Sequence, residues 1–423
     1  MKRIILLLLL FKGFTAVAQL VDHIYQPNIH SVKLFKYGDI YSYPVMNLNS
    51  GEQFELHFDD LDADVKNYYF SFQLCNADWT PSSLFTFDYT RGFQSQRINT
   101  YRNASISFTR YTHYQAMVPD RNSVPTRSGN YLLKVFLNDD TSKLVFTKRF
   151  LVVDNKVSLA ARMMQPFGGT YFRTHQRVQV TVNTATAKLN IFSPQDIKLQ
   201  VVQNYSWPTA VYLDRPTIYR GNYFEYSDDA LSFPAGREWR WINLSSVRLM
   251  SDRMRDILKT NNRIDVLVKP DGERNQQVYV YYRDNNGLFT IENEDGNNPY
   301  WQSDYAYTHF TFVPPGNRAY PGRNIYLFGE LTNYAIDDST KMIFNPEKGV
   351  YEKTLFLKQG FYNYSYVTTP EKRRAADPVS FDNTEGNFQA TENSYMVLVY
   401  FRAFGARADE LIGYANVNSM AGF

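Results

Sequence analysis

Between Tyr68 and Phe150 the chain runs through short stretches of alternating residues, each of which ends at a turn. Tyr68–Leu74 places Phe70, Phe72 and Leu74 at alternate positions, and Gly, Pro, Asn or Asp residues bound both this stretch and Tyr131–Leu137. A two-residue period is typical of strands that bury one face, and closely spaced turns join such strands into antiparallel sheets. The region therefore predicts a β-sandwich.

The same pattern continues along the chain, and we expect the rest of the molecule to be all-β as well. Only Ser246–Lys259 has apolar residues at helical spacing, and the preceding Trp239-Arg240-Trp241 favours a strand there. The strands that we expect are Gln53–Phe58, Tyr68–Leu74, Tyr131–Leu137, Lys143–Val153, Val178–Val182, Ile197–Val202, Ile264–Val268, Gln277–Tyr282, Tyr307–Val313, Asn324–Phe328, Val350–Leu357, Tyr362–Val367 and Met396–Phe401.

A loose repeat predicts how many sandwiches there are. A glycine that can take a positive φ comes just before an aromatic strand start at Gly129, Gly221 and Gly360. The segment 154–156 and the Pro/Gly stretch 314–316 look like linkers. We therefore expect residues 1–18 to be a signal peptide, followed by sandwiches over 19–154, 155–314 and 315–423.

The first residues have the layout of a secretory signal. Lys2 and Arg3 precede the apolar run Ile4–Phe11, and Ala16-Val17-Ala18 supplies a small-x-small cleavage pattern that makes Gln19 the mature start. The apolar run is shorter than the roughly 20 residues that a membrane-spanning helix needs. Since no later segment is long enough either, we expect an exported chain without a membrane anchor.

Composition limits both the source of stability and the class of partner. Cys75 is the single cysteine, so no intrachain disulfide can form, and we expect it to pack in a strand rather than to act as a nucleophile. The 45 basic and 42 acidic residues nearly balance, and no basic stripe is interleaved with aromatic residues as in nucleic-acid-binding proteins.

The common catalytic and metal-binding motifs are missing from the sequence. The six histidines are scattered without metal-ligand spacing, although a zinc site assembled across the fold is left open. The acidic stretches Asp59–Asp64 and Glu292–Asn298 lack the spacing of a calcium loop and are interpreted as solvated turns. Asp78, beside Trp79, is interpreted as a turn residue and not as a glycosidase carboxylate. We expect a protein that is not an enzyme and has no cofactor.

The C-terminal third resembles the early-set, immunoglobulin-like sandwich that serves as a starch- or glycogen-binding module. The resemblance rests on Gly329–Tyr334, Asp377-Pro378 and Asn387. It implies that Tyr334 takes the position of the family's sugar-stacking Trp. Since fold alone does not carry function, a carbohydrate-binding accessory protein is kept as the alternative. An outer-membrane barrel fits less well, because most of the expected strands are shorter than about 10 residues.

A second resemblance covers most of the mature chain. The segments Phe72–Trp79, Asp88–Phe93, Tyr111–Tyr114 and Ser128–Tyr131, with Arg149-Phe150, are similar to the plug protein of the type IX secretion system, a Bacteroidetes family. The resemblance implies a periplasmic protein that closes the periplasmic opening of a large outer-membrane β-barrel translocon.

On this resemblance the expected partner is the barrel translocon, and nucleic acid and glycan are not expected partners. The protein would lie in the periplasm, attached to the outer membrane through that barrel. An enzyme comes third, since it would need a pocket that joins Asp78 or Asp60 to a second carboxylate. The candidate partner-binding residues are Asn76, Asp78, Trp79, Tyr89, Phe93, Tyr111, His113 and Tyr114.

Overall fold

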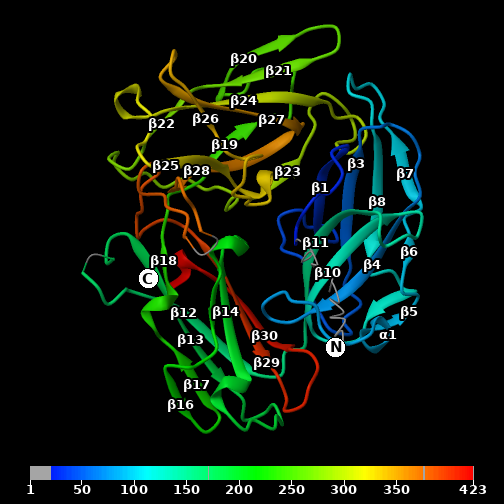
Figure 1. The fold of residues 1–423 in the computed structure, drawn as a ribbon, viewed down its shortest axis with the longest axis vertical. Coiled ribbons are helices and arrows are strands. Elements are labelled where there is room, and N and C mark those ends of the chain that lie inside the picture. Colours follow the sequence, from blue (N-terminus) through cyan, green and yellow to red (C-terminus); the bar gives the residue numbers. More distant parts are fainter. Residues whose placement is uncertain (1–20, 170, 375–376, 423) are drawn as a thin grey trace, which may run out of the picture.

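A computed structural model describes residues 21–169, 171–374 and 377–422, and it is built almost entirely of β-strands (Figure 1). The predicted signal peptide, residues 1–18, lies outside the described residues. Among the described parts, the strands form pairs of facing sheets with apolar side chains between them. The prediction of tandem β-sandwiches is therefore confirmed.

The first sandwich has one sheet in the order β1-β3-β8-β7 and a second in the order β2-β11-β10-β4-β6, with β5 and β9 as a small extra pair. Its core contains Phe58, Tyr68, Tyr131 and Phe150, because these residues occupy the inward positions of alternating strands. Its elements are β1 (Ile29–Lys36), β2 (Val45–Asn47), β3 (Phe54–Asp60), β4 (Tyr68–Cys75), α1 (Thr86–Tyr89), β5 (Thr90–Gly92), β6 (Gln96–Arg97), β7 (Thr100–Asn103), β8 (Thr112–Val118), β9 (Ser123–Pro125), β10 (Gly129–Leu137) and β11 (Leu144–Val153).

A second sandwich is made from two separate parts of the chain, and we call it the split sandwich. One sheet has the order β12-β13-β17-β16, with β18 also on β13, and the other has the order β15-β14-β29-β30. Its elements are β12 (Ser158–Met164), β13 (His175–Asn183), η1 (Pro194–Asp196), β14 (Ile197–Gln203), η2 (Trp207–Thr209), β15 (Val211–Leu213), β16 (Ile218–Arg220), β17 (Tyr223–Tyr226), η3 (Asp229–Leu231), β18 (Ser232–Pro234), β29 (Ser394–Phe401), β30 (Glu410–Asn418) and η6 (Ser419–Gly422).

The third sandwich lies between these two parts in the sequence, and we call it the inserted sandwich. Its sheets have the orders β19-β28-β23, with β25 also on β28, and β20-β21-β24-β27-β26, with β22 also on β24. Its elements are β19 (Arg240–Asn243), β20 (Met254–Lys259), β21 (Ile264–Val268), β22 (Asp271–Gly272), β23 (Phe289–Ile291), β24 (Tyr305–Val313), η4 (Pro315–Asn317), β25 (Arg323–Phe328), η5 (Glu330–Thr332), β26 (Ile343–Asn345), β27 (Val350–Lys358) and β28 (Gly360–Pro370).

The sheets do not follow the three consecutive segments predicted from the sequence. The boundary at 314/315 falls between β24 and its partner β27, which pair from Tyr305↔Lys358 to Phe312↔Tyr351. The expected third segment also contains β29, which pairs with β14. The arrangement has a physical reason: every residue of β29 is buried, and β14 pairs with it along its whole length, from Ile197↔Phe401 to Gln203↔Tyr395. We propose that the chain divides into 21–154, a split unit of 155–235 with 391–422, and an inserted unit of 236–390.

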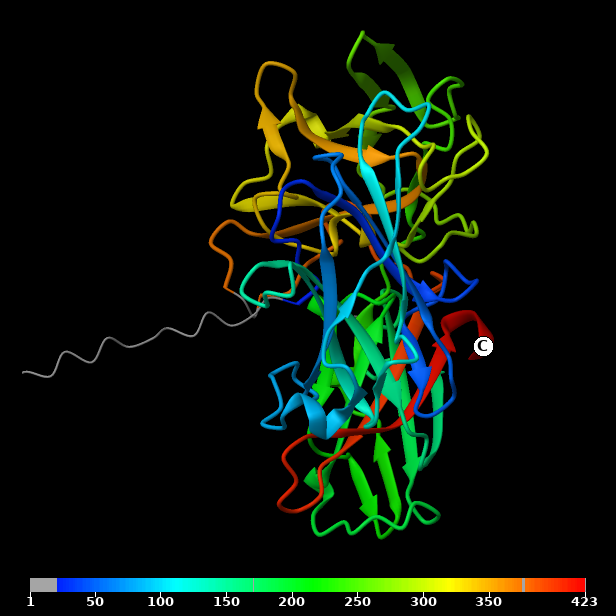
Figure 2. The same cartoon turned by 90° about the vertical axis from the view of Figure 1, so that its right-hand side faces the viewer.

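One local prediction is corrected and another is confirmed. Gln277–Tyr282 is not a strand, because it pairs with no other strand in the described ranges. Instead, Arg237 donates to the carbonyl oxygens of Gln277 (2.9 Å) and Val278 (2.6 Å). The helical spacing in Ser246–Lys259 ends in a strand, β20, which pairs with β21. Turned by 90°, the first sandwich lies across both the inserted sandwich above and the split sandwich below (Figure 2).

Candidate partner-binding site

His113 and Tyr111 lie where the first sandwich meets the inserted sandwich. The strand pairing of β3 with β8 sets Asp59 opposite His113, and the Asp59 carboxylate accepts a hydrogen bond from His113 Nδ1 at 2.7 Å. The same carboxylate accepts from Lys358 Nζ at 2.5 Å and from the Tyr305 hydroxyl at 2.6 Å, both in the inserted sandwich. Asp59 is thus the centre of a buried polar junction between the two sandwiches.

The charges at this junction are almost completely hidden from water. The side chains of Asp59 and Lys358 are each 1% exposed. Burial opposes ionisation of Asp59, but Lys358 and His113 hold its pKa below the ordinary value. Burial lowers the pKa of His113 to about 4, although Asp59 acts in the opposite direction. A buried ion pair adds little net stability, but loss of one partner is costly, so the junction fixes how the two sandwiches meet.

Tyr111 completes the junction from the side of the first sandwich. Its hydroxyl donates to the carbonyl oxygen of Ser303 at 2.8 Å, and the Lys358 ammonium lies 4.3 Å from the centre of its ring. Nearby, the Asp304 carboxylate accepts from the backbone N–H groups of Phe108 and Thr109. His113 and Tyr111 therefore join the first sandwich to the inserted sandwich, and their buried side chains are not accessible to a partner.

Asn76 and Trp79 form a second junction, between the first sandwich and the split sandwich. The Arg149 guanidinium lies 4.8 Å from the ring centre of Trp79 and 5.0 Å from that of Trp207. The side-chain oxygen of Asn76 accepts from Arg402, which lies on the loop between β29 and β30. Both predicted residues are thus used inside the molecule.

Three further candidates belong to the first sandwich itself. Tyr114 is fully buried and stacks on Phe58 at 5.1 Å, while Tyr89 is 4% exposed and packs against Tyr131. Asp78 is exposed and accepts from the Thr80 backbone N–H at 3.0 Å and from its hydroxyl at 2.6 Å. Asp78 is therefore a turn residue, as the sequence predicted.

Phe93 differs from the other aromatic candidates, because 68% of it is exposed. It follows β5, and its backbone N–H donates to the carbonyl oxygen of Asn122. The sequence analysis missed four more exposed phenylalanines, Phe85, Phe87, Phe192 and Phe404, whose exposed fractions are 63%, 66%, 78% and 90%. These exposed phenylalanines could have been predicted from Leu84-Phe85-Thr86-Phe87 and from Phe404-Gly405, because phenylalanine lies outside any expected strand in both segments.

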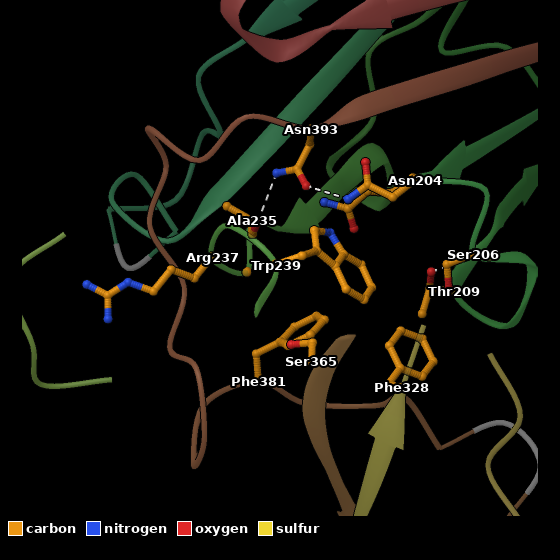
Figure 3. A pocket seen from close by; sticks show the side chains of 12 residues that line it. Asn204, Ser206, Thr209, Ala235, Arg237, Trp239, Phe328, Ser365, Phe381 and Asn393 are labelled. Atoms are coloured by element: carbon orange, nitrogen blue, oxygen red, sulfur yellow. Dashed lines mark hydrogen bonds between the residues drawn. The ribbon is translucent and has the colours of Figure 1, made fainter. Parts of the chain in front are cut away.

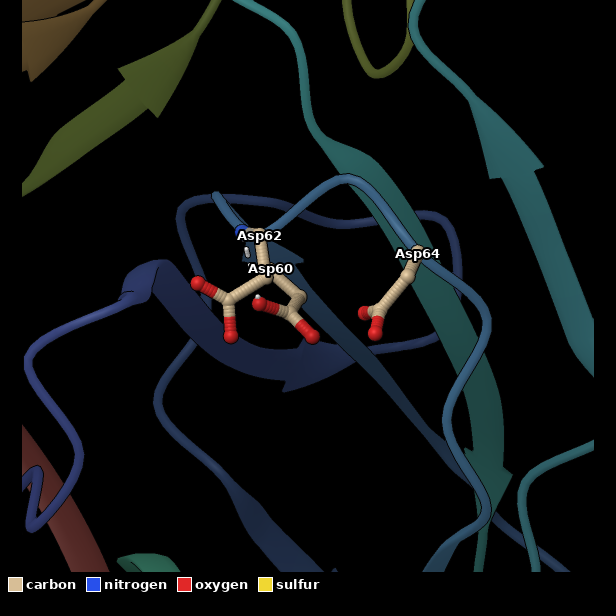
Figure 4. Close-up of side chains that lie close together, drawn as sticks. All are labelled: Asp60, Asp62 and Asp64. Atoms are coloured by element: carbon tan, nitrogen blue, oxygen red, sulfur yellow. Dashed lines mark hydrogen bonds between the residues drawn. The ribbon is translucent and has the colours of Figure 1, made fainter.

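The acidic stretch after β3 does gather three carboxylates, those of Asp60, Asp62 and Asp64 (Figure 4). The Lys66 ammonium contacts all three, at 2.9 Å from Asp60 and 3.4 Å from Asp64. A lysine thus supplies the positive charge that a cation would bring. Asp62 and Asp64 are exposed turn residues as predicted, whereas Asp59 and Asp60 are buried at the end of β3, which corrects the interpretation of the whole stretch as a solvated turn. Cys75 is buried, and burial raises the pKa of its thiol to about 12, so it is a packing residue as predicted.

Tyr334 cannot stack on a sugar in this structure. It is 4% exposed, packs edge-on against Phe328 at 5.3 Å, and donates to the carbonyl oxygen of Asn204 at 2.9 Å. The nearby cavity between the split and inserted sandwiches, walled by Trp239, Phe328 and Phe381, holds about 30 Å³ (Figure 3). That volume suits a water molecule. Tyr334 itself lines a larger cleft of about 640 Å³, with Arg149 and Trp207, but only 4% of Tyr334 is exposed. The predicted glycan-stacking role is corrected, because the split sandwich covers the ring.

None of the helices within the described ranges has the length and apolar character needed to span a bilayer.

Three comparisons relate the chain to known proteins. Residues 29–154 match the family described as type 9 secretion system plug protein, first domain. Among solved structures, the chain is similar to a hypothetical protein from Parabacteroides merdae, with 32% identity and a TM-score of 0.87. That similarity covers 93% of this chain and 98% of the other. No curated protein matches the chain.

Proposed function

This chain belongs to the type 9 secretion system plug protein family, and from that premise we propose that it docks on the periplasmic opening of a large outer-membrane barrel translocon and seals it. It acts there as a non-enzymatic subunit of the secretion apparatus. Its place is the periplasm, where the barrel partner holds it at the outer membrane.

The observation that carries the proposal is the buried junction around Asp59. A protein that seals an opening must keep a fixed shape. Three sandwiches joined only by flexible linkers would move relative to one another. Here Asp59, Lys358 and His113 hold the first and inserted sandwiches in one arrangement. Arg149, between Trp79 and Trp207, does the same for the first and split sandwiches.

The residues of the Asp59 junction support a structural role. Asp59, His113 and Lys358 would be an unusual set for catalysis, because each is at most 4% exposed and each already has a partner within the chain. A substrate could reach them only if the sandwiches separated.

The test is co-purification from native membranes. A tagged chain expressed in its own host is recovered after mild detergent extraction, and its partners are identified by mass spectrometry. A large outer-membrane barrel is the expected partner. Recovery of the tagged chain alone, under conditions that keep other envelope complexes intact, would contradict the proposal. In cells that lack the chain, entry of a normally excluded dye should rise if the protein seals a pore.

A further inference from the structure

Phe85, Phe87, Phe192 and Phe404 expose large parts of their rings to solvent, and we call these four residues the phenylalanine face. Their exposed fractions run from 63% for Phe85 to 90% for Phe404. Single exposed apolar residues are ordinary on protein surfaces, whereas a connected group of them marks a place of interaction.

The contacts between these residues show that they form one connected group. Phe85 and Phe87 stack with ring centres 5.5 Å apart, and Phe192 and Phe404 meet edge to face at 6.2 Å. The loop between β29 and β30 links the two pairs, because it carries Phe404 and also Arg407, whose guanidinium lies 5.7 Å from the ring centre of Phe85. The face therefore spans the first sandwich and the split sandwich.

The loop that carries Phe404 is anchored at its end. Ala408 is buried in the core of the first sandwich. Asp409 accepts from the Ala77 backbone N–H at 3.0 Å and from Lys198 at 3.0 Å. On the other side of the face, the Asp88 carboxylate accepts from the Phe85 backbone N–H at 3.0 Å. The rings thus project from backbone that is held in place, which lowers the entropy cost of binding.

The exposed area points to a protein partner. A whole phenylalanine side chain buries about 200 Å², so the exposed parts of the four rings come to about 600 Å². That is at the upper end of the largest apolar patch on a typical monomer, and close to the roughly 800 Å² that each side contributes to a specific protein interface.

The charges beside the rings are mostly basic. Arg91, Arg407 and Lys188 are exposed on the segments that carry the rings. Two neighbouring acids are engaged with backbone N–H groups: Asp88 with Phe85, and Asp196 with Phe192 and Ser193. A complementary surface would be apolar at its centre and acidic at its edge.

We propose that the phenylalanine face is the surface through which this chain attaches to its partner, a protein rim with apolar side chains and an acidic border. The inference rests on the proposed function, in which that rim belongs to the barrel translocon. It assigns the attachment to the junction of the first and split sandwiches and leaves the inserted sandwich outside it.

The test compares three tagged chains in the co-purification from native membranes. They are the wild type, the variant Phe85→Ser/Phe87→Ser/Phe192→Ser/Phe404→Ser, and a control with Tyr37→Ser/Ile343→Ser. Tyr37 and Ile343 are 71% and 64% exposed. Tyr37 follows β1 and Ile343 begins β26, and neither segment carries a ring of the face, so the control loses apolar surface elsewhere. Circular dichroism and a thermal melt check that each chain folds, and a single Phe404→Ser variant serves if the fourfold variant does not.

The proposal predicts that wild type and control recover the barrel, while the fourfold variant recovers at least tenfold less. Equal recovery by all three chains overturns the inference and leaves the proposed function standing. If the wild type recovers no barrel, both fail. Binding of purified wild type to vesicles of anionic phospholipid, lost in the fourfold variant, would assign the face to a membrane. Dimerisation of the wild type, lost in the variant, would assign it to a second copy of the chain. Either result overturns a barrel-rim partner.

Discussion

Replacing Lys358 by methionine tests whether the buried junction holds the first and inserted sandwiches together. The Lys358 ammonium donates to the Asp59 carboxylate and to the carbonyl oxygen of Tyr300, each at 2.5 Å. Methionine keeps most of the side-chain volume but removes the charge. Asp59 would then be a buried carboxylate without its lysine partner.

The size of the effect follows from what remains around Asp59. Removing one partner of a buried ion pair costs about 3–5 kcal/mol. Asp59 would keep its hydrogen bonds from Tyr305 and His113. We therefore expect the low end of that range, about 3 kcal/mol of unfolding free energy. Asp59→Asn/Lys358→Met should recover at least about 1 kcal/mol of this loss, because no buried charge is then left unpaired.

Urea unfolding, followed by circular dichroism and tryptophan fluorescence, measures the effect. The first transition is the one to compare, because a chain of several sandwiches need not unfold in one step. Lys348→Met is the matched control: Lys348 pairs with Glu352 at 2.8 Å, but its side chain is 63% exposed. That change should cost less than about 0.5 kcal/mol. If Lys358→Met costs no more than Lys348→Met, the junction does not hold the sandwiches together.

Two other changes address single residues. Because burial lowers the pKa of His113 from 6.5 to about 4, the unfolded chain binds a proton there that the folded chain does not. Stability should thus fall as pH drops from 6.5 to about 4, by about 3 kcal/mol at roughly 1.4 kcal/mol per pKa unit. His113→Gln should flatten that slope in urea titrations, and an unchanged slope would contradict the assignment. Tyr334→Ala should cost about 3 kcal/mol as a large-to-small core change, whereas Tyr334→Phe loses only the hydrogen bond to Asn204, about 1 kcal/mol. A glycan array that shows binding lost in Tyr334→Ala at unchanged stability would restore the sugar-stacking role.

Much of the secondary structure could be predicted, because apolar and polar residues alternate along a strand that buries one face, and this two-residue period is visible in the sequence. The repeated glycines also marked one strand in each sandwich, although for different reasons. Gly221 has φ +59°, as a turn requires. At Gly360 the need is space, since a Cβ there would lie 2.1 Å from the carbonyl oxygen of Thr290.

The site was harder to predict, because exposure depends on how the sandwiches pack. Tyr111 and Phe93 are both aromatic residues near strand ends and were given the same role. Tyr111 is 1% exposed and Phe93 is 68% exposed, since the inserted sandwich covers one and nothing in the described chain covers the other. No local pattern distinguishes the two cases.

Residues that are near neighbours along the chain were enough to predict that the protein is all-β and built from sandwiches, and their motifs indicated the family. The folded molecule was needed to show that the C-terminal strands return to the split sandwich. It also shows that Asp59, Lys358 and His113 meet, and that four phenylalanines form one face. Each of these depends on contacts between residues more than 50 positions apart, such as Asp59 and Lys358, which are separated by 299 residues.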